Sequence, residues 1–172
     1  MKIIGSYPTN RMRRNRKSKW SRKLVSEISL SSSDLIWPIF LTEGNKKTQK
    51  IKSMPFVNRY SIDKLGNIVE KAIKLKIPLL ALFPNTPNKL KDKMGKEALN
   101  ENNLVCQALR FIKKRFKDEI GLMCDVALDP YTSHGHDGIL KDKYVENDQT
   151  VEILIKQALL QAQMGCDVIA PS

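Results

Sequence analysis

A stretch near the middle of the chain concentrates the side chains that could take part in chemistry. It runs Asp125-Val-Ala-Leu-Asp-Pro-Tyr-Thr-Ser-His-Gly-His-Asp-Gly138 and holds both histidines of the 172-residue sequence together with three carboxylates. The mostly apolar run 120–128 is short enough for a buried strand, and Pro130 with two glycines then predicts a loop. Such groups at the carboxyl end of a buried strand are how α/β enzymes present reactive side chains. The sequence therefore indicates a functional site here, against the alternative of a polar loop with satisfied hydrogen bonds.

The histidines and hydroxyls of this loop have two interpretations each. His134 and His136 could transfer protons, or could hydrogen-bond a loop carbonyl, and the sequence favours neither. Ser133 and Thr132 are more typical of residues that stabilise a turn than of nucleophiles, because no activating base is identifiable. We expect Asp125 to be a buried partner for the loop rather than a free acid, whereas Tyr131 could either pack or donate a hydrogen bond.

The elements that must position this loop can be read from hydrophobic patterning. Apolar runs predict four strands, at 34–41, 79–83, 120–128 and 167–170. Helical periodicity predicts three helices between them, opening at Ser61 as N-cap, centred on 104–116, and covering 151–162 up to Gly165. Residues 42–60 are expected to form a polar loop. Alternating strands and helices predict parallel βαβ units, and the right-handed crossover allows a doubly wound sheet or part of a barrel.

The positive charge of the chain is unevenly distributed. Residues 1–26 contain nine Lys or Arg and no acid, so they account for +9 of the net +12 and the rest for +3. We therefore expect a basic N-terminal arm over 1–30 and one domain over 31–172. The arm could be a solvated tail, a phosphate-binding segment with only Trp20 for base stacking, or a segment that contacts another subunit.

The cysteine content and hydropathy exclude several classes of protein. Three cysteines, Cys106, Cys124 and Cys166, are widely spaced and fit neither a disulfide framework nor a structural zinc site, which favours a reducing cytosol. Cys124 is expected to be a buried strand residue. No apolar run is long enough for a membrane span, and the N-terminus lacks a secretory core, although an acid-free, Arg-rich start is also compatible with a mitochondrial transit peptide. We expect a cytoplasmic protein.

Motifs along most of the chain resemble one enzyme family. The segment Tyr131-Thr-Ser-His-Gly-His136 resembles the site loop of 5-aminolevulinate dehydratase, also called porphobilinogen synthase. Further matching motifs follow in the same order, at 11–16, 34–40, 53–55, 81–84, 147–150 and 169–172. The resemblance implies the first half of a (β/α)8 barrel, truncated after the fourth strand, because a complete barrel needs about 250 residues.

The same resemblance implies a function. The family condenses two molecules of 5-aminolevulinate to porphobilinogen, with loss of two waters, in tetrapyrrole and heme biosynthesis. It uses two lysines that form Schiff bases and lie after the segment Ala170-Pro-Ser172, so no lysine of this chain is assigned to that role; Lys141 and Lys143 are expected to be solvated. The resemblance also implies a homo-oligomer, an octamer in the family, in which the basic arm wraps a neighbouring subunit.

The loop departs from the zinc-dependent branch of the family. Those members place three cysteines where this chain has Ala127, Asp129 and Asp137. An alanine and two carboxylates make a poor zinc site, so zinc is not expected at 125–138. The resemblance implies that Asp129 and Asp137 line the active site, where they could orient the amino group of a substrate or hold a hard cation. Any Mg²⁺ site is expected outside this chain.

The candidate catalytic residues are therefore Asp129, Asp137, Ser133 and His134, and the candidate metal ligands are Asp129 and Asp137. We expect the 172-residue chain to be inactive alone because the lysines are absent. Two alternatives remain: an inactive remnant, and a module that binds a polyanion through the basic arm. Neither a membrane nor a nucleic-acid partner is otherwise indicated.

Overall fold

The computed structural model describes residues 5–10 and 13–172, and the chain divides into two compact units, Met1–Ser31 and Ser32–Ser172. The smaller unit contains a 3-10 turn, η1 (Arg14–Arg16), and a short helix, α1 (Lys19–Leu24). The Arg22 guanidinium donates to the Arg16 carbonyl at 2.8 Å, which ties helix and turn together. Trp20 and Leu24, one helical turn apart, are 72% and 78% exposed. Arg11 and Met12 of the basic motif lie outside the described residues.

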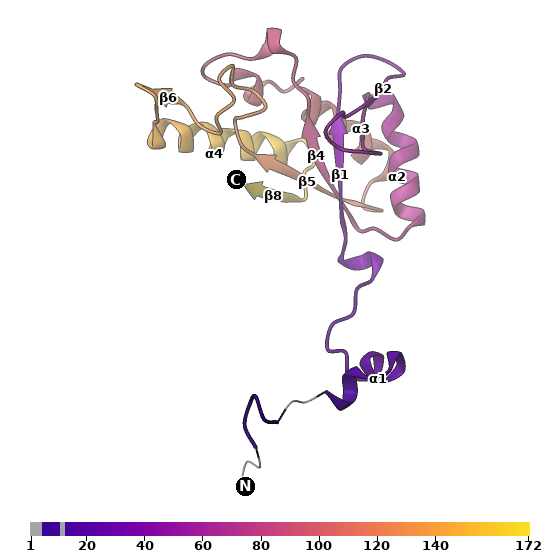
Figure 1. The fold of residues 1–172 in the computed structure, drawn as a ribbon. Helices are drawn as coiled ribbons and strands as arrows, with labels where there is room; N and C mark the ends of the chain where they lie inside the picture. Colours follow the sequence, from indigo (N-terminus) through magenta and orange to yellow (C-terminus); the bar gives the residue numbers. More distant parts are fainter. Residues whose placement is uncertain (1–4, 11–12) are drawn as a thin grey trace. The chain divides into compact units, whose positions relative to one another are not determined.

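The larger unit is built on a six-stranded sheet with the order β2-β3-β1-β4-β5-β8 (Figure 1). Its parallel part consists of the four strands that the sequence predicts: β1 (Ile36–Leu41), β4 (Leu79–Pro84), β5 (Gly121–Val126) and β8 (Val168–Pro171). Each of these strands pairs in parallel with the next one. Their carboxyl ends therefore meet at one end of the sheet.

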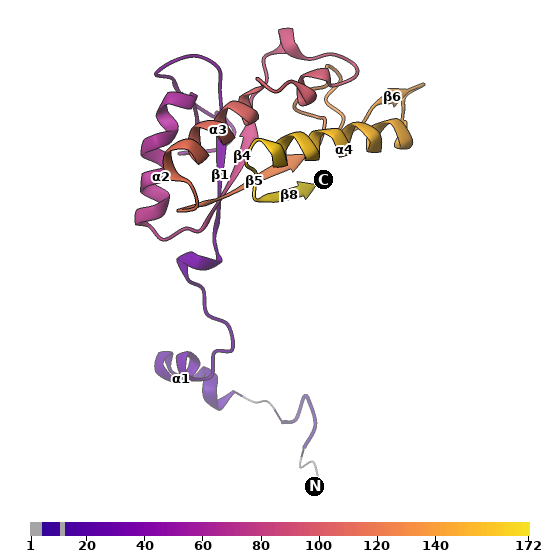
Figure 2. The same cartoon turned by 180° about the vertical axis from the view of Figure 1, so that it is seen from behind.

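Three helices connect these strands: α2 (Leu65–Lys74), α3 (Leu104–Phe116) and α4 (Asn147–Gln163). Figures 1 and 2 show all three on the same face of the sheet. A doubly wound sheet carries helices on both faces, whereas a barrel carries them only outside. The arrangement is therefore that of part of a (β/α)8 barrel.

The core lies between the sheet and these helices. On β5, Leu122, Cys124 and Val126 are buried towards it, while Met123 and Asp125 alternate onto the other, half-buried face. Leu80, Leu82, Leu109 and Ile112 are at most 1% exposed and belong to the same cluster. The prediction that Cys124 is a buried strand residue is confirmed.

The start of α3 and the end of α4 have local causes. The Asn103 side chain accepts a hydrogen bond from the Cys106 backbone N–H at 2.9 Å and caps α3. At the end of α4, Gly165 has φ of +100°, and the N–H groups of Gly165 and Cys166 donate to the carbonyls of Ala162 and Gln161. This is the Schellman arrangement, which a glycine adopts without steric cost, so the predicted stop at Gly165 is confirmed.

The expected loop at 42–60 is wrong. It contains β2 (Thr48–Lys50) and β3 (Asn58–Tyr60), antiparallel to each other, with β3 parallel to the end of β1. Ser61 does not act as a side-chain cap of the next helix, which begins at Leu65 after the 3-10 turn η3 (Ile62–Lys64). Its hydroxyl instead donates to the Asp63 carboxylate at 2.7 Å and accepts from the Lys47 N–H at 2.9 Å. Strands this short and polar give almost no sequence signal, because only their long-range pairing defines them.

The remaining elements are short. The 3-10 turn η2 (Ser32–Asp34) precedes β1, and η4 (Asn88–Leu90) and η5 (Lys96–Leu99) lie between β4 and α3. A small hairpin, β6 (Leu140–Lys141) with β7 (Tyr144–Val145), separates the site loop from α4. Lys141 and Lys143 are exposed on this hairpin, as expected.

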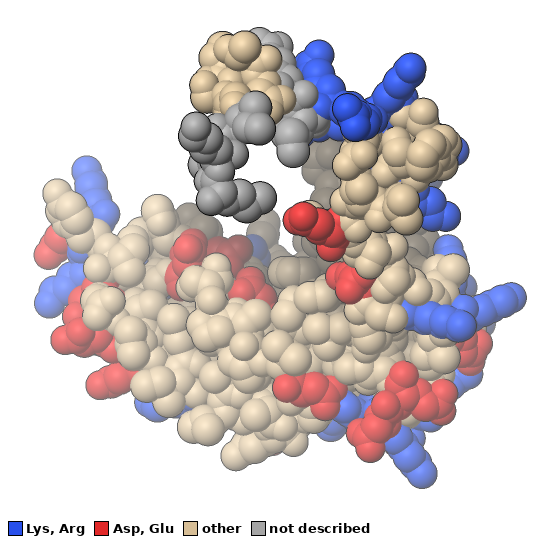
Figure 3. Space-filling model, turned by 90° about the horizontal axis from the view of Figure 1, so that it is seen from below, with Lys and Arg blue, Asp and Glu red and all other residues tan. Residues whose placement is uncertain are grey.

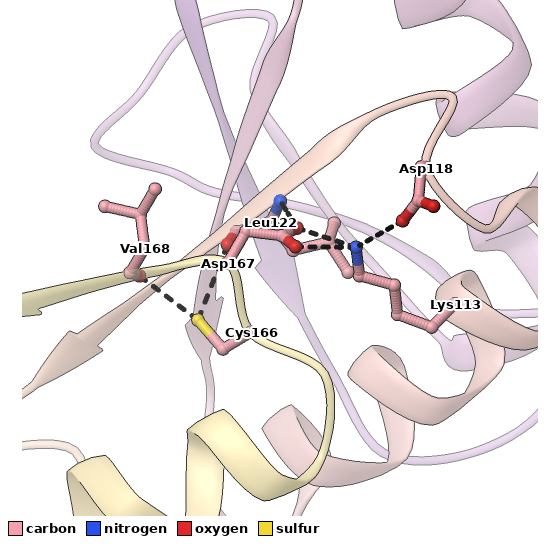
Figure 4. Close-up of polar contacts among 6 residues, drawn as sticks. All are labelled: Lys113, Asp118, Leu122, Cys166, Asp167 and Val168. Carbon is pink, nitrogen blue, oxygen red and sulfur yellow. Dashed lines mark hydrogen bonds and ion pairs between the residues drawn. The ribbon is translucent and has the colours of Figure 1, made fainter.

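A polar cluster joins β8 to β5 and α3 at the amino end of the strands (Figure 4). The Asp167 carboxylate accepts from the Leu122 N–H at 2.8 Å and forms an ion pair with Lys113 at 2.8 Å. The Lys113 ammonium also lies 3.8 Å from Asp118, whose side chain is fully exposed. Both carboxylate oxygens of Asp167 thus have a partner, and this residue, which directly precedes β8, is bound to β5 and α3.

The surface of the larger unit shows no single-sign patch on the face in Figure 3, where acidic and basic side chains are interspersed. Within the described part of the chain, no helix is long and apolar enough to cross a membrane.

Candidate functional site

The site loop follows β5 and turns back on itself within a few residues. The Leu128 carbonyl accepts hydrogen bonds from the N–H groups of Tyr131 and Thr132, both at 2.9 Å, and the Leu128 N–H donates to the Asp137 carbonyl at 3.2 Å. Tyr131 is 3% exposed and packs with Leu128, Ala98 and Ile139. Tyr131 therefore anchors the loop by packing, and burial raises the pKa of its hydroxyl.

A second segment, 91–96, pairs with this loop, and the sequence did not indicate this contact. Asp92 and Thr132 form a parallel bridge, in which the Asp92 N–H donates to the Tyr131 carbonyl and the Ser133 N–H donates to the Asp92 carbonyl at 2.9 Å. Gly95, with φ of +62°, approaches the side chains of Leu128 and Thr132. The two segments are about 40 residues apart in the chain, so no local pattern predicts their contact.

The charges of three carboxylates influence one another at the carboxyl end of β5. Burial, and then the charges of Asp129 and Asp137, raise the pKa of Asp125 above its ordinary value of 3.8. Burial and the charge of Asp137 likewise raise the pKa of Asp129, with Lys91 opposing. Asp137 is exposed.

Within the described residues, the side chain of Asp125 forms no hydrogen bond or ion pair, so the expectation of a buried partner for the loop is wrong. The strand alternation directs this side chain to the open face of the sheet instead. A cluster of like charges is electrostatically unfavourable, and Lys91, which acts on Asp129, opposes it only in part. A positively charged group bound near these carboxylates would relieve it further.

The described residues do not supply a complete metal site. Nowhere in residues 5–10 and 13–172 do three His, Cys, Asp or Glu side chains come together in a way that could hold an ion. Ala127, at the first of the three positions, is 3% exposed and has no ligand atom on its side chain. Zinc sites use at least three protein ligands, so Asp129 and Asp137 alone do not fit one.

The His134 ring and the Thr132 hydroxyl are hydrogen-bonded to backbone groups near the site. The Nδ1 atom of His134 accepts from the His136 N–H at 3.2 Å, so Nε2 carries the proton and donates to the Lys93 carbonyl at 3.3 Å. The Thr132 hydroxyl donates to the His136 carbonyl at 2.8 Å, whereas the Ser133 side chain is exposed. Both ring nitrogens of His134 are thus hydrogen-bonded to backbone groups. This favours a structural role for His134 over a role in proton transfer.

Two buried glutamines support the strand end from α4. The Nε2 groups of Gln157 and Gln161 donate to the carbonyls of Ala127 and Asp125, at 3.2 and 2.9 Å. Their side chains are 1% and 3% exposed, and both Oε1 atoms have no partner among the described residues. Glutamines four residues apart on the buried side of a predicted helix are the sequence signal that could have revealed them.

Comparisons with known proteins agree along nearly the whole chain. The family model described as delta-aminolevulinic acid dehydratase matches residues 9–172. The delta-aminolevulinic acid dehydratase of Bradyrhizobium diazoefficiens is 57% identical over 162 residues, which cover 94% of this chain and 46% of the relative. That of Chlamydia pneumoniae is 42% identical over 164 residues, covering 95% and 49%.

A solved structure shows the same fold. The crystal structure of delta-aminolevulinic acid dehydratase from Toxoplasma gondii, in complex with the reaction product porphobilinogen, is similar with a TM-score of 0.88 and 39% identity. The match covers 95% of this chain and 46% of that one. This chain spans about half the length of the relatives that it matches.

The fold and the site define part of a (β/α)8 barrel that carries its polar loop at the carboxyl ends of the strands, where barrel enzymes bind substrates. With the family model covering the chain from residue 9 onwards, this chain belongs to the delta-aminolevulinic acid dehydratase family. The predicted family and fold class are thus both confirmed.

Proposed function

We propose that this chain provides the amino-terminal part of a porphobilinogen synthase, which condenses two molecules of 5-aminolevulinate to porphobilinogen and releases two waters. The observation that carries the proposal is the cluster of Asp125, Asp129 and Asp137 at the carboxyl end of β5, in a chain that the family model matches over 9–172. The product complex of the Toxoplasma gondii relative supports the same substrate class.

The proposed role of the cluster follows from its electrostatics. Burial, and then the charges of neighbouring carboxylates, raise the pKa values of Asp125 and Asp129, and the part due to like charges favours binding of a positive group. The ammonium group of 5-aminolevulinate is such a group. Asp129 and Asp137 would hold and orient it, while Gln157, Gln161 and the 91–96 segment fix the backbone from which these carboxylates project.

Covalent chemistry is expected to come from elsewhere in the protein. The family's Schiff-base lysines lie on later strands, and Lys141 and Lys143 occupy an exposed hairpin. The family generally uses metal ions, and any such ion would require ligands beyond Asp129 and Asp137. The 172-residue chain alone is therefore expected to form no porphobilinogen. The octameric assembly through the basic arm and the cytoplasmic location are part of the same proposal, and exposed Trp20 and Leu24 give the arm apolar groups for such a contact.

A chimera tests the proposal. Residues 9–172 of this chain would replace the matching half of the Bradyrhizobium diazoefficiens relative, and pyrrole formation from 5-aminolevulinate would be measured with Ehrlich's reagent. We expect activity in the chimera, reduced about 100-fold or more by Asp129→Asn because an oriented charge is lost.

Asp118→Asn is the matched control, because Asp118 is fully exposed at the other end of the strands. Its activity should equal that of the parent chimera. A folded chimera without activity, or equal activity of the Asp129→Asn and parent proteins, would contradict the assigned role. Turnover by the 172-residue chain alone would contradict the expected location of the lysines.

A further inference from the structure

Helix α4 exposes aliphatic side chains and buries polar ones. Val151, Ile155 and Leu159, spaced four residues apart, are 44%, 54% and 59% exposed. The four buried residues of this helix, three of them polar, are Thr150, Gln157, Leu160 and Gln161. A helix that covers a core normally turns its apolar stripe towards that core. The aliphatic stripe of α4 faces solvent in this chain instead.

This stripe points away from the other helices. At the end of α4 the Met164 sulfur accepts a hydrogen bond from the Arg110 guanidinium of α3 at 3.0 Å, which marks the side of α4 next to α3. Ile155 precedes Met164 by nine residues, about two and a half turns at 3.6 residues per turn, and so lies on the opposite side. β8, beside α4 in Figures 1 and 2, pairs only with β5 among the described strands. The stripe of α4 and the free edge of β8, together called the α4–β8 surface, thus bound the same side of the unit.

The other edge of the parallel strands carries a second free surface. β3 pairs with β1 only over the last two residues of β1, so residues 36–39 pair on one side only, with β4. Beside them, between β1 and the end of α2, lies a hollow of about 310 Å³ with mainly apolar walls. Leu35, Ile36 and Leu75 in these walls are 41%, 48% and 49% exposed. This region, called the β1 edge, combines unpaired strand backbone with apolar side chains, as the α4–β8 surface does.

A single partner can cover both surfaces. A barrel is a sheet closed on itself, and this unit supplies four parallel strands in the order β1-β4-β5-β8. Four further strands would complete the eight of a barrel if the first paired with β8 and the last with β1. The match covers 46% of the Bradyrhizobium diazoefficiens relative and 46% of the Toxoplasma gondii chain, so more than half of each relative lies outside it. A complementary half is thus long enough to reach both edges.

We propose that the α4–β8 surface and the β1 edge are one docking interface for the complementary half of the barrel, and that the two halves associate without a peptide bond between them. The partner has a helix that lays apolar side chains on Val151, Ile155 and Leu159, followed by a strand that pairs in parallel with β8. Backbone pairing at both edges fixes the register, and burial of the apolar surfaces drives association.

The identity of the partner rests on the proposed function, because the complementary half is the carboxyl-terminal part of a porphobilinogen synthase. The two surfaces themselves follow from exposure and strand pairing alone. Binding and catalysis can therefore be tested separately.

Co-expression of two separate chains tests the docking. One is the 172-residue chain with an affinity tag, and the other is the part of the Bradyrhizobium diazoefficiens relative that follows its matched residues. We expect the tagged chain to keep the second chain soluble and to retain it through purification. Light scattering after gel filtration should give the mass of a 1:1 complex.

Variants of exposed residues locate the interface. Ile155→Lys places a charge in the middle of the stripe and should reduce the retained partner about 10-fold or more. Gln149→Lys is the matched control, because Gln149 is exposed on the same helix outside the stripe, and it should retain as much partner as the parent. Leu75→Lys should also reduce retention, because the same partner covers the β1 edge. All three variants should keep the urea midpoint of the parent when the 172-residue chain is measured alone.

Several results would overturn the docking. These are a second chain that stays insoluble or unretained beside this one, equal retention by Ile155→Lys and the parent, and full retention by Leu75→Lys. A dimer of the 172-residue chain that Ile155→Lys dissociates, with no retained partner, would show that a second copy occupies the surface instead.

Pyrrole formation by the purified complex, measured with Ehrlich's reagent, separates this proposal from the proposed function. A 1:1 complex that forms no pyrrole supports the docking and contradicts the proposed function. Two chains that do not associate, together with an active covalent chimera, contradict the docking and support the proposed function.

Discussion

The aspartates at the two ends of β5 have opposite electrostatic environments. At the amino end, both oxygens of Asp167 are engaged by Lys113 and the Leu122 N–H. At the carboxyl end, burial and the charges of neighbouring carboxylates raise the pKa values of Asp125 and Asp129. In barrel enzymes the amino end of the strands serves stability and the carboxyl end serves chemistry. The comparison shows that the aspartate at the amino end has a hydrogen-bond donor and a counter-charge, whereas the aspartates at the candidate functional end raise the pKa of one another.

The largest effect is expected at the amino end. Asp167→Ala removes the ion pair with Lys113 and leaves the Leu122 N–H without its acceptor, so unfolding should become easier by about 1–2 kcal/mol. Urea denaturation followed by circular dichroism measures this change. Asp118→Ala is the control, because its exposed ion pair at 3.8 Å should contribute less than about 0.5 kcal/mol. Equal losses of stability in the two variants would show that the contacts of Asp167 do not stabilise the amino end of the strands.

A smaller effect of opposite sign is expected at the carboxyl end. Asp125→Asn removes a charge that burial and two carboxylates disfavour, so the chain should gain up to about 1 kcal/mol at pH 7, limited by solvent screening of a half-buried group. The same urea titration measures the gain. Asp142→Asn, on the exposed hairpin, should change nothing. A clear loss of stability in Asp125→Asn would mean that this carboxylate has a stabilising partner.

The pH dependence of stability should separate the two ends further. The folded chain binds protons at Asp125 and Asp129 more tightly than the unfolded chain, whose value is near 3.8. Stability from these groups is thus full below that pH and declines as pH rises towards their raised pKa values. The hydrogen bond from Ser61 lowers the pKa of Asp63, whose contribution instead is lost as pH falls.

Subtracting the urea midpoints of Asp125→Asn/Asp129→Asn from those of the parent, at each pH from about 3 to 7, cancels the Asp63 contribution. The urea midpoint of the parent should fall relative to that of the double variant as pH rises above 3.8. A difference that is constant, or that moves in favour of the parent, would show that these carboxylates are not disfavoured in the folded chain.

The smallest effect is expected from zinc. Two carboxylates without a third ligand are a poor site, so the purified chain should retain only substoichiometric zinc after dialysis, measured by atomic absorption. Asp129→Ala should leave that amount unchanged. Stoichiometric zinc in the parent that is lost in Asp129→Ala would show that the carboxylates at the carboxyl end of β5 form a metal site. It would contradict the view that they lack a bound counter-charge.

Much of the fold could be predicted because its determinants are local. The apolar run before Pro130 predicts β5 and the break into the site loop, and the period of α3 and Gly165 at the end of α4 are equally visible. The paired strands β2 and β3 were missed, because three-residue polar strands are defined by partners that lie far away in the chain. The candidate site residues could be selected by type from the sequence, but the segment 91–96 and the two glutamines, which bind the backbone around them, could not.

The sequence by itself determined the four parallel strands, the three helices between them, the family, and the presence of Asp129 and Asp137 in the loop after β5. Only the tertiary structure decided which of these groups are satisfied. Asp125 and Asp167 are both aspartates next to apolar strand residues, and nothing local distinguishes them. The Asp167 carboxylate binds the Leu122 N–H, 45 residues away, and Lys113, 54 residues away, whereas the charges that act on Asp125 are those of other carboxylates. Pairing of charges depends on distance in space, which the chain order does not encode locally, and that pairing separates a stabilising aspartate from a candidate functional one.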